Sequence, residues 1–371
     1  MYKYMNEQGV RTKAWYCSDE PIRGVLDREF GVEVKWDIPL LEGYEYAFFK
    51  NQSWRPSHTK GFFGLINFGM VRQLFREPKS IIVVHGWHYL THFLILMLGK
   101  FKGHTICLRN ETPLKQDVLK GGWKQAIKRN SLKYVLFPRI HYFMYIGTQN
   151  RLLYRSYGLP EERLVFCPYA IDNSRFKIQS TRHKQVIPQI KASLGVPEDS
   201  RVILFSGKYI DKKNPLDLLR AFMQVDVRDC WLIMIGEGEL RSEMEAFISE
   251  NRLSRVILTG FVNQSSIAEY YAIGDVFVMC SGVGETWGLS VNEAMNFNLP
   301  VILSDLAGCS DDLVKEGHNG FVFKTGDINE LSEKLNQVLI HKNLSWSITS
   351  ENLIEKFSYS AMLHNICSNI S

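Results

Sequence analysis

Short apolar runs alternate with longer stretches of helical periodicity along the chain of 371 residues. In the second half, glycine or polar turn residues bound five such runs: RVILFSG, CWLIMIG, RVILTGF, DVFVMCS and PVILSD. Helix-length segments such as PLDLLRAFMQ and IAEYYAIG separate them. Continuous apolar strands are typical of a parallel sheet that is covered on both faces. The second half is therefore predicted to be a doubly wound α/β domain.

The first half repeats this plan with TKAWYCS, SIIVVHGW, HTICLRNE, YFMYIGTQ and LVFCPYAI. Between the halves, residues 173–190 are polar and lack periodicity, which favours a linker. We predict an N-terminal domain over 1–180, a C-terminal domain over 181–350, and a C-terminal helix over 351–371 that packs back on the first domain. Ligands of open α/β sheets bind beyond the carboxyl ends of the strands, so the site is expected in a cleft between the two domains.

The composition is that of an ordinary globular protein, with 45% hydrophobic and 22% charged residues. Seven cysteines without a CxxC pair indicate neither a disulfide framework nor a zinc site, and they fit a reducing cytoplasm. The N-terminus does not resemble a signal peptide, and the longest apolar run, FLILML at 93–98, is far shorter than the roughly 20 residues that span a bilayer.

Charge divides the chain unevenly. Residues 1–184 carry 29 Lys and Arg against 15 Asp and Glu, whereas residues 185–371 carry 15 against 24. The sharpest basic run lies at 114–133, where Lys120, Lys124 and Lys128 recur every four residues with Trp123 and Ile127 among them. This pattern favours an interfacial helix on an anionic membrane surface. A solvated helix face is the alternative, and nucleic acid is disfavoured because no recognisable module accompanies the run.

Two lysines follow the first strand of the second half. Gly207 ends that strand, Lys208 comes next, and Lys213 lies five residues further on. A glycine lets a ligand approach the backbone closely, and two ammonium groups at the carboxyl end of a strand can neutralise a diphosphate without a metal. Solvated lysines on a turn are the alternative interpretation.

Two acids stand eight positions apart in GETWGLSVNEAM, where a glycine turn leads into a helix. Glu285 and Glu293 would lie roughly 12 Å apart along a continuous helix. That span is too long for the paired acids of a glycosidase, which lie roughly 5 to 9.5 Å apart. It suits a sugar at Glu285 and a ribose at Glu293, with the diphosphate between them near the helix N-terminus. Two surface glutamates are the alternative.

These residues resemble the retaining glycosyltransferases of family 4, which have the GT-B fold. GETWGLSVNEAM is similar to the family's E-x7-E motif, FSGKYIDKKNPLDLLRAF to its phosphate-binding segment, and MIGEGEL, GFV and DLVKEGHNGFVF follow in the family's order. The resemblance covers about residues 80–370. HGW, LRNE and PYAID are similar in particular to transferases of bacterial surface polysaccharide pathways.

The resemblance implies a role for each motif residue. Lys208 and Lys213 would hold the donor diphosphate, and Glu293 the ribose hydroxyls. Glu285 would contact the transferred sugar, and Phe261 and Val262 would border the base. The distal phosphate and sugar would also meet the backbone of the turn, which comprises Gly284, Thr286, Trp287, Gly288 and Leu289.

Three residues of the first half complete the predicted site. The family has a functional histidine where this chain has His85, which would orient the donor sugar through its imidazole. A structural histidine is the alternative. Where many relatives carry a second histidine, this chain has Arg109 and Asn110. We assign Arg109 and Glu111 to acceptor or phosphate contact, with mutual pairing as the alternative.

The family opens with a strand and a glycine-containing loop. Here Met1 begins in MYKYMNEQGVRTKAWYCS, which resembles the helix after that strand. The first strand is therefore expected to be missing, through a start codon assigned late or a truncated gene.

Together these features predict a retaining, metal-independent glycosyltransferase without a cofactor. The resemblance implies transfer from a UDP- or GDP-sugar to a lipid-linked or polysaccharide acceptor in exopolysaccharide, capsule or O-antigen synthesis. The protein would be cytoplasmic and peripheral on the inner face of the cell membrane. A sugar-nucleotide epimerase or hydrolase and a non-catalytic nucleotide-sugar-binding protein remain as alternatives, because fold alone does not separate them.

Overall fold

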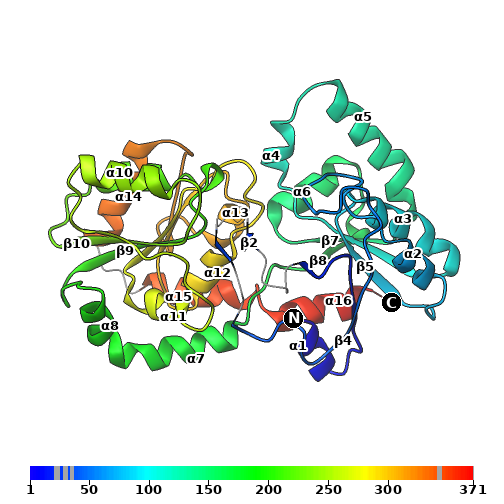
Figure 1. Ribbon diagram of the computed structural model, residues 1–371, viewed down its shortest axis with the longest axis horizontal. Helices are drawn as coiled ribbons and strands as arrows, with labels where there is room; N and C mark the ends of the chain where they lie inside the picture. Colours follow the sequence, from blue (N-terminus) through cyan, green and yellow to red (C-terminus); the bar gives the residue numbers. More distant parts are fainter. Residues whose placement is uncertain (21–25, 28–31, 34–36, 341–344, 371) are drawn as a thin grey trace. The chain divides into compact units, whose positions relative to one another are not determined.

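The computed structural model describes residues 1–20, 26–27, 32–33, 37–340 and 345–370, and the chain forms two compact units (Figure 1). Unit 1 comprises residues 1–23, 41–168 and 359–371. Unit 2 comprises residues 24–40 and 169–358. The chain therefore passes between the units at 168/169, earlier than the predicted boundary after residue 180.

Unit 2 is built on a six-stranded parallel sheet whose strands lie in the order β11-β10-β9-β12-β13-β14. The strands are β9 (Arg201–Ser206), β10 (Cys230–Ile235), β11 (Val256–Leu258), β12 (Val276–Met279), β13 (Val301–Ser304) and β14 (Gly320–Phe323). Helices α9 (Pro215–Phe222), α10 (Arg241–Glu250), α11 (Ile267–Ile273), α12 (Leu289–Met295), α13 (Ser310–Leu313) and α14 (Ile328–Ile340) follow the strands in turn. A short antiparallel pair, β2 (Leu26–Asp27) and β3 (Val32–Glu33), precedes them.

The strand order of unit 2 reverses direction between β9 and β12. From β9 the chain adds β10 and β11 on one side, and then returns to add β12, β13 and β14 on the other. The loops that follow the neighbouring strands β9 and β12 therefore lead away from each other at the carboxyl ends of these strands. Doubly wound sheets bind their ligands at this point. The five predicted strands of the second half are all confirmed, whereas β14 was not predicted because its apolar run is short.

Unit 1 contains a four-stranded parallel sheet in the order β5-β6-β7-β8. The strands are β5 (Ile81–His85), β6 (Thr105–Arg109), β7 (Tyr142–Tyr145) and β8 (Leu164–Phe166). Helix α2 (Phe68–Leu74) precedes β5, and the helical segments between the strands are α3 (Leu90–Leu98), η2 (Gly99–Lys102), α4 (Leu114–Val118), α5 (Trp123–Ser131), η3 (Leu132–Leu136, a π-helix), η4 (Phe137–Arg139), α6 (Thr148–Ser156) and η5 (Glu161–Arg163). One apolar core joins α2, α3 and α6 to this sheet.

The predicted strand TKAWYCS forms β1 (Lys13–Tyr16), which pairs in parallel with β4 (Glu45–Phe48) in a separate two-stranded sheet. Asn67 ties this small sheet to the rest of unit 1. Its buried Nδ2 donates to the carbonyl oxygens of Cys17 at 2.9 Å and Phe49 at 2.8 Å, and Thr91 Oγ1 donates to its Oδ1 at 3.1 Å.

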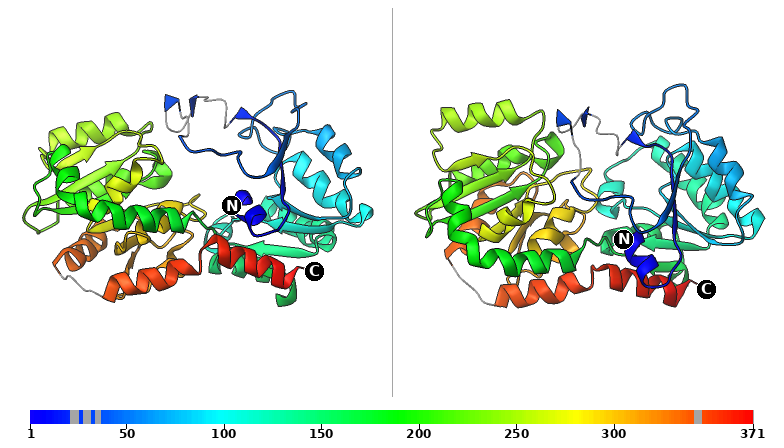
Figure 2. Two further views of the ribbon diagram at one scale, coloured as in Figure 1. Left: turned by 90° about the horizontal axis from the view of Figure 1, so that it is seen from below. Right: turned by 60° about the horizontal axis from the view of Figure 1, so that its bottom comes forward.

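The last helix, α16 (Tyr359–Asn369), belongs to unit 1, while α15 (Ser345–Glu355) belongs to unit 2. The predicted C-terminal helix over 351–371 thus divides between the units. Met362 of α16 and Ile370, which directly follows the helix, pack on Cys107, Met144 and Val165 of the four-stranded sheet. Helix α1 (Tyr2–Glu7) lies beside α16, with the rings of Tyr4 and Tyr359 5.9 Å apart (Figure 2).

The predicted linker over 173–190 is wrong, because this segment is helical. It forms α7 (Asn173–His183), η6 (Lys184–Val186) and most of α8 (Ile187–Ser193), and α7 is a long helix in Figure 1. Asp172 caps α7 by accepting a hydrogen bond from the Arg175 backbone, and Phe176 is buried against the rings of Tyr271 and Phe297. Phe176 thus packs α7 against the rest of unit 2, although the polar sequence of this helix shows no apolar periodicity.

The predicted basic helix over 114–133 is also interrupted. Residues 114–118 form α4, and Gly122, at φ 97°, opens α5 at Trp123. Lys120 therefore lies outside the stripe that carries Lys124 and Lys128. Buried Asp117 joins the two helices by accepting hydrogen bonds from Gln125 and Arg129. Within the described part of the chain, no helix combines the length and apolar character needed to cross a membrane.

Replacing Asn67 tests how far unit 1 depends on this one side chain. Asn67→Ala leaves two buried carbonyl groups without their donor, so the free energy of unfolding should fall by about 2 to 4 kcal/mol in urea unfolding. Asn369→Ala, at an exposed position on α16, is the matched control and should change it by less than about 0.5 kcal/mol. Equal stability of the two variants would contradict this role.

Candidate functional site

The reversal of strand order in unit 2 brings two loops together, one after β9 and one after β12. Gly207 directly follows β9, and its carbonyl oxygen lies 1.9 Å from where a Cβ on Gly236 would stand. Only a glycine at 236 therefore lets the loops after β9 and β10 approach so closely. Lys208, half-buried, follows Gly207. The predicted phosphate-binding residues thus stand at the point where ligands of such sheets bind.

Lys213 and Glu285 form a buried ion pair across these two loops. Lys213 ends the 3-10 turn η7 (Asp211–Lys213), and its Nζ donates to Oε2 of Glu285. Ser281 Oγ donates to the same oxygen at 3.3 Å. The structure therefore brings together the residue predicted for the diphosphate and the residue predicted for the sugar.

The loop that carries Glu285 is not helical. Gly284 and Gly288 have φ of 104° and 107°, which other residues rarely adopt, and α12 begins only at Leu289. The prediction that both acids lie along one helix is wrong for Glu285. Glu285 and Glu293 are held by different elements, so their eight-residue spacing does not measure a rise along a helix.

Trp287 packs into the protein interior. Its ring is buried and adjoins the rings of Tyr169 and Phe357, and its Nε1 donates to Asn292 Oδ1 at 2.9 Å. Only the backbone of Trp287 is then available to a ligand. The carbonyl oxygen of Thr286 lies 1.9 Å from where a Cβ on Gly308 would stand. The loop after β13 therefore packs directly against this turn, and a side chain at position 308 would clash with it. Leu289, at the start of α12, is exposed.

Glu293 lies on α12 and is buried among polar side chains. Tyr271 donates its hydroxyl to Oε2 at 2.7 Å, and Gln264 donates its amide to Oε1 at 3.3 Å. Arg175 in turn donates to the side-chain oxygen Oε1 of Gln264 at 2.6 Å. Burial raises the pKa of Glu293, and the hydrogen bonds from Tyr271 and Gln264 oppose that rise. A buried carboxylate held in this way is typical of a functional site.

The segment after β11 holds the predicted base contacts. Phe261 and Val262 are half-buried and directly precede the loop with Gln264. A residue from the first half of the sequence supports this loop: Asp37 accepts hydrogen bonds from the backbone and hydroxyl groups of Ser265, and its own backbone donates to Asn263. Tyr271, Gln264 and Asp37 were missed from the sequence, because no motif marks a residue that acts through a tertiary contact.

In unit 1, His85 and Arg109 are register partners at the carboxyl ends of β5 and β6. His85 is exposed. Arg109 is buried and donates to the carbonyl oxygens of Cys167 and Pro168, at 3.5 and 3.3 Å. Its guanidinium thus contacts backbone rather than solvent, while Glu111 is half-buried.

The described residues contain no group of three or more His, Cys, Asp or Glu side chains suited to a metal ion. His88 and His92 lie on or before α3, and His92 Nε2 is 3.7 Å from the sulfur of Cys17.

Residues 186–356 match the family described as glycosyl transferases, group 1. An alpha-monoglucosyldiacylglycerol synthase of Acholeplasma laidlawii is 30% identical over 166 residues, which are 44% of this chain and 40% of that protein. The matched segment spans less than half the length of the curated relatives that are at least 30% identical.

Two solved structures show the same fold as the whole chain. A glycosyltransferase from Rickettsia africae superposes with a TM-score of 0.73 at 14% identity, covering 99% of this chain and 91% of that one. An Anabaena protein in complex with UDP-glucose superposes with a TM-score of 0.66 at 16% identity, covering 88% and 86%. The predicted GT-B fold is confirmed.

The pH dependence of stability tests the state of Glu293. Because its pKa is raised by folding, the folded chain keeps the proton to higher pH than the unfolded chain, and stability falls as the pH rises above the unfolded value of about 4.3. Glu293→Gln removes this loss, so the melting temperature of the variant should gain on that of the parent as the pH rises above about 4. Glu250→Gln, at an exposed position, is the control. Parallel melting curves for parent and Glu293→Gln would contradict a raised pKa.

Proposed function

We propose that this chain, which through residues 186–356 belongs to the glycosyl transferases of group 1, transfers a sugar from a UDP- or GDP-sugar to a lipid-linked or glycan acceptor with retention. The pathway we propose is the synthesis of a cell-surface polysaccharide. The observation that carries the proposal is the buried pair of Lys213 and Glu285 at the place where the strand order of unit 2 reverses.

The pair suits a donor whose charge changes during the reaction. Lys213 and Lys208 would neutralise the diphosphate, and without a metal they would stabilise it further as the glycosidic bond breaks. Glu285, beside Lys213, would accept hydrogen bonds from hydroxyls of the sugar as it becomes cation-like. The departing phosphate would take the acceptor proton, so the protein mainly positions the reactants. The Anabaena complex with UDP-glucose supports this class of donor.

Glu293 would bind the ribose. Each carboxylate oxygen can accept more than one hydrogen bond, so the bonds from Tyr271 and Gln264 leave capacity for two ribose hydroxyls. Gln264 and Tyr271 fix the orientation of the carboxylate, and Phe261 and Val262 lie in the same loop as Gln264 for the base.

Unit 1 would serve the acceptor. His85 stands at a strand end where open α/β sheets bind ligands, and a neutral imidazole can both donate and accept a hydrogen bond. Arg109 would contribute positive potential there through its buried guanidinium rather than direct contact. Trp123 and Ile127 are exposed on α5 beside Lys124 and Lys128, which supports peripheral association with an anionic membrane. The printed name of the Acholeplasma relative supports a lipid acceptor.

Thermal-shift measurements with a panel of nucleotide sugars test the donor class, because a ligand that binds the folded state raises the melting temperature. Turnover measured with and without an acceptor then separates the transferase from the epimerase or hydrolase, which would turn over without one. Donor binding without any turnover would favour a nucleotide-sugar-binding protein.

The anomeric configuration of the product tests whether transfer proceeds with retention. Activity measured in the presence of a metal chelator tests whether the enzyme is independent of metal.

Substitutions of Lys213 and Glu285 should affect nucleotide binding differently, which distinguishes the roles of the two residues. Lys213→Ala should weaken binding of UDP or GDP, whichever the parent binds, by about 1.5 to 3 kcal/mol, the usual value for a hydrogen bond to a charged group. Glu285→Gln removes the negative charge beside Lys213, so it should bind that nucleotide at least as tightly as the parent while turnover falls.

Calorimetry and steady-state kinetics provide both values. Lys356→Ala, at an exposed position on unit 2, should match the parent. Unchanged nucleotide binding by Lys213→Ala would remove this residue from the donor site, and unchanged turnover by Glu285→Gln would remove the acid.

The basic helix yields a separate prediction. Charge reversal at Lys124 and Lys128 should reduce the salt-dependent part of binding to anionic vesicles, while nucleotide binding stays intact. Reversal at Lys100 and Lys102, which are exposed on η2, is the matched control. Equal sedimentation of the parent with neutral and anionic vesicles would contradict an electrostatic contact.

A further inference from the structure

A second surface of unit 1 combines cations with aromatic side chains. From Tyr46 to Arg76 the sequence contains five Lys and Arg residues and no Asp or Glu. Neither the basic helix nor the proposed chemistry of transfer accounts for this segment. Most of it forms one loop over residues 51–66, named the aromatic loop below.

Hydrogen bonds give the aromatic loop a defined shape. The Gln52 backbone donates to the Ile66 carbonyl oxygen at 2.7 Å, which closes the neck of the loop. Asn51 donates to Gly64 at 2.8 Å and accepts from Ser53 and Ile66. A Cβ on Gly64 would lie 2.1 Å from the Ser57 carbonyl oxygen, so the interior of the loop is closely packed. The side chains that it presents are therefore held in place by the backbone.

The aromatic loop nevertheless exposes large apolar side chains. Trp54 is 70% exposed, Phe63 48% and Phe62 39%. The ring centroids of Trp54 and Phe63 lie 5.4 Å apart, and those of Phe62 and Phe63 lie 5.1 Å apart, so the three form one cluster. Leaving such a cluster in water costs free energy, and clustered exposed apolar groups mark interaction sites.

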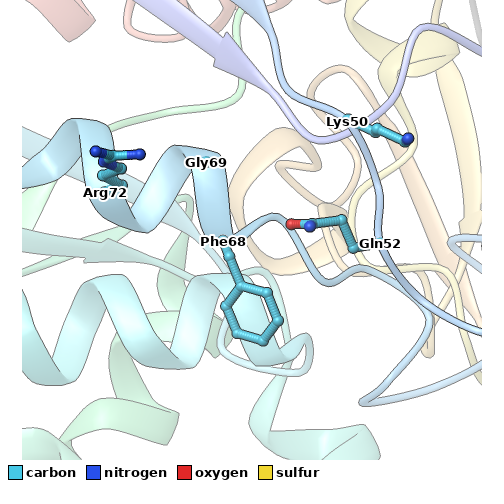
Figure 3. Close-up of a pocket in the computed structure, with 5 residues that line it drawn as sticks. All are labelled: Lys50, Gln52, Phe68, Gly69 and Arg72. Atoms are coloured by element: carbon cyan, nitrogen blue, oxygen red, sulfur yellow. The ribbon is translucent and has the colours of Figure 1, made fainter.

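Cations occur in the aromatic loop and at its neck. A pocket at the neck of the loop is lined by Lys50, Gln52, Phe68, Gly69 and Arg72, and Figure 3 shows the Gln52 amide between the Lys50 and Arg72 side chains. Arg55 and Lys60, both exposed, lie within the loop itself. A phosphate group could bind among these donors while an apolar chain contacts the rings.

The aromatic loop and the basic helix α5 both contact the turn that joins β5 to α3. The Leu90 backbone donates to the Phe62 carbonyl oxygen at 2.8 Å, and the Tyr89 hydroxyl donates to that of His58 at 2.7 Å. Lys128 of α5 lies 5.8 Å from the ring centroid of Trp87 in the same turn. This turn follows His85 at the end of β5, so both surfaces adjoin the proposed acceptor side of unit 1.

We propose that the aromatic loop inserts Trp54, Phe62 and Phe63 into the interface of an anionic lipid membrane, with a lipid phosphate bound between Lys50 and Arg72. The proposal rests on the proposed peripheral association and assigns it a second contact. The helix α5 supplies long-range attraction that salt weakens, while the loop supplies apolar burial that salt leaves intact.

Charge and shape favour a membrane over a glycan as the occupant. The three rings meet edge-to-face or tilted, so they do not form one continuous flat platform on which a sugar could stack. Aromatic rings with cations nearby are enriched at the headgroup level of membranes. A lipid surface also matches the absence of acids over 46–76.

Vesicle sedimentation at low and high salt tests the proposal. The parent should bind vesicles of phosphatidylcholine with phosphatidylglycerol more tightly than vesicles of phosphatidylcholine alone. The double variant Trp54→Ser with Phe63→Ser should lose at least about tenfold in partitioning at both salt concentrations, because it loses apolar burial. Lys50→Glu with Arg72→Glu should lose mainly the preference for the anionic lipid.

Phe101→Ser is the matched control, because Phe101 is 73% exposed beside Lys100 and Lys102 on η2, beyond the other end of α3. It should bind vesicles like the parent, and the melting temperatures of all variants should agree. Parent-like binding by Trp54→Ser with Phe63→Ser would overturn the proposal. So would intact vesicle binding with lost turnover on a water-soluble acceptor, which would assign the loop to a glycan.

Nucleotide binding by the same samples separates this proposal from the proposed function. Loss of vesicle binding with normal binding of UDP or GDP supports the loop as a membrane contact. If the parent binds vesicles through the loop but binds no nucleotide, the proposed transferase function is contradicted and the membrane contact is not. A parent that binds nucleotide but no vesicle would contradict the membrane contact alone.

Discussion

The ion pair between Lys213 and Glu285 is the interaction on which the candidate site depends. Buried ion pairs contribute little net stability, because the loss of hydration of both charges offsets most of their attraction. Two apolar side chains would fill the same space at least as favourably. A lysine and a glutamate at the strand-order reversal of unit 2 are therefore explained better by the proposed binding of a ligand than by a contribution to stability.

The surrounding structure holds this pair in place at several points. Gly284 and Gly288 adopt backbone angles that let the turn curve around Glu285, and Gly308 leaves room for the carbonyl oxygen of Thr286. Trp287 anchors the turn by burying its ring and bonding to Asn292. Short glycine contacts and one large buried ring thus fix a loop that has no regular secondary structure, which is what a preorganised anion site requires.

The sequence allowed the parallel sheets to be predicted, because buried strands are continuously apolar, and the distinctive E-x7-E segment marks the residues of the candidate site. It did not reveal that Glu285 precedes the helix, since positive φ at Gly284 and Gly288 decides that locally. Helix α7 was taken for a linker because one residue, Phe176, provides most of its apolar contact. Tyr271 and Gln264 could not be found, because their distance to Glu293 depends on where the tertiary fold places α11 and the loop before it.

Unit 1 differs from unit 2 in what it leaves in contact with water. Among the described residues, sixteen of the twenty-three exposed large hydrophobic side chains belong to unit 1, which also contains most of the basic half of the sequence. A domain that only had to fold would bury such groups or replace them with polar ones. The proposed contact with a membrane, whose anionic headgroups lie above an apolar interior, would explain why exposed rings and excess positive charge occur in the same unit. Under the proposed function, unit 2 would supply a polar site for a soluble donor, and unit 1 an amphipathic face for an acceptor that stays in the lipid.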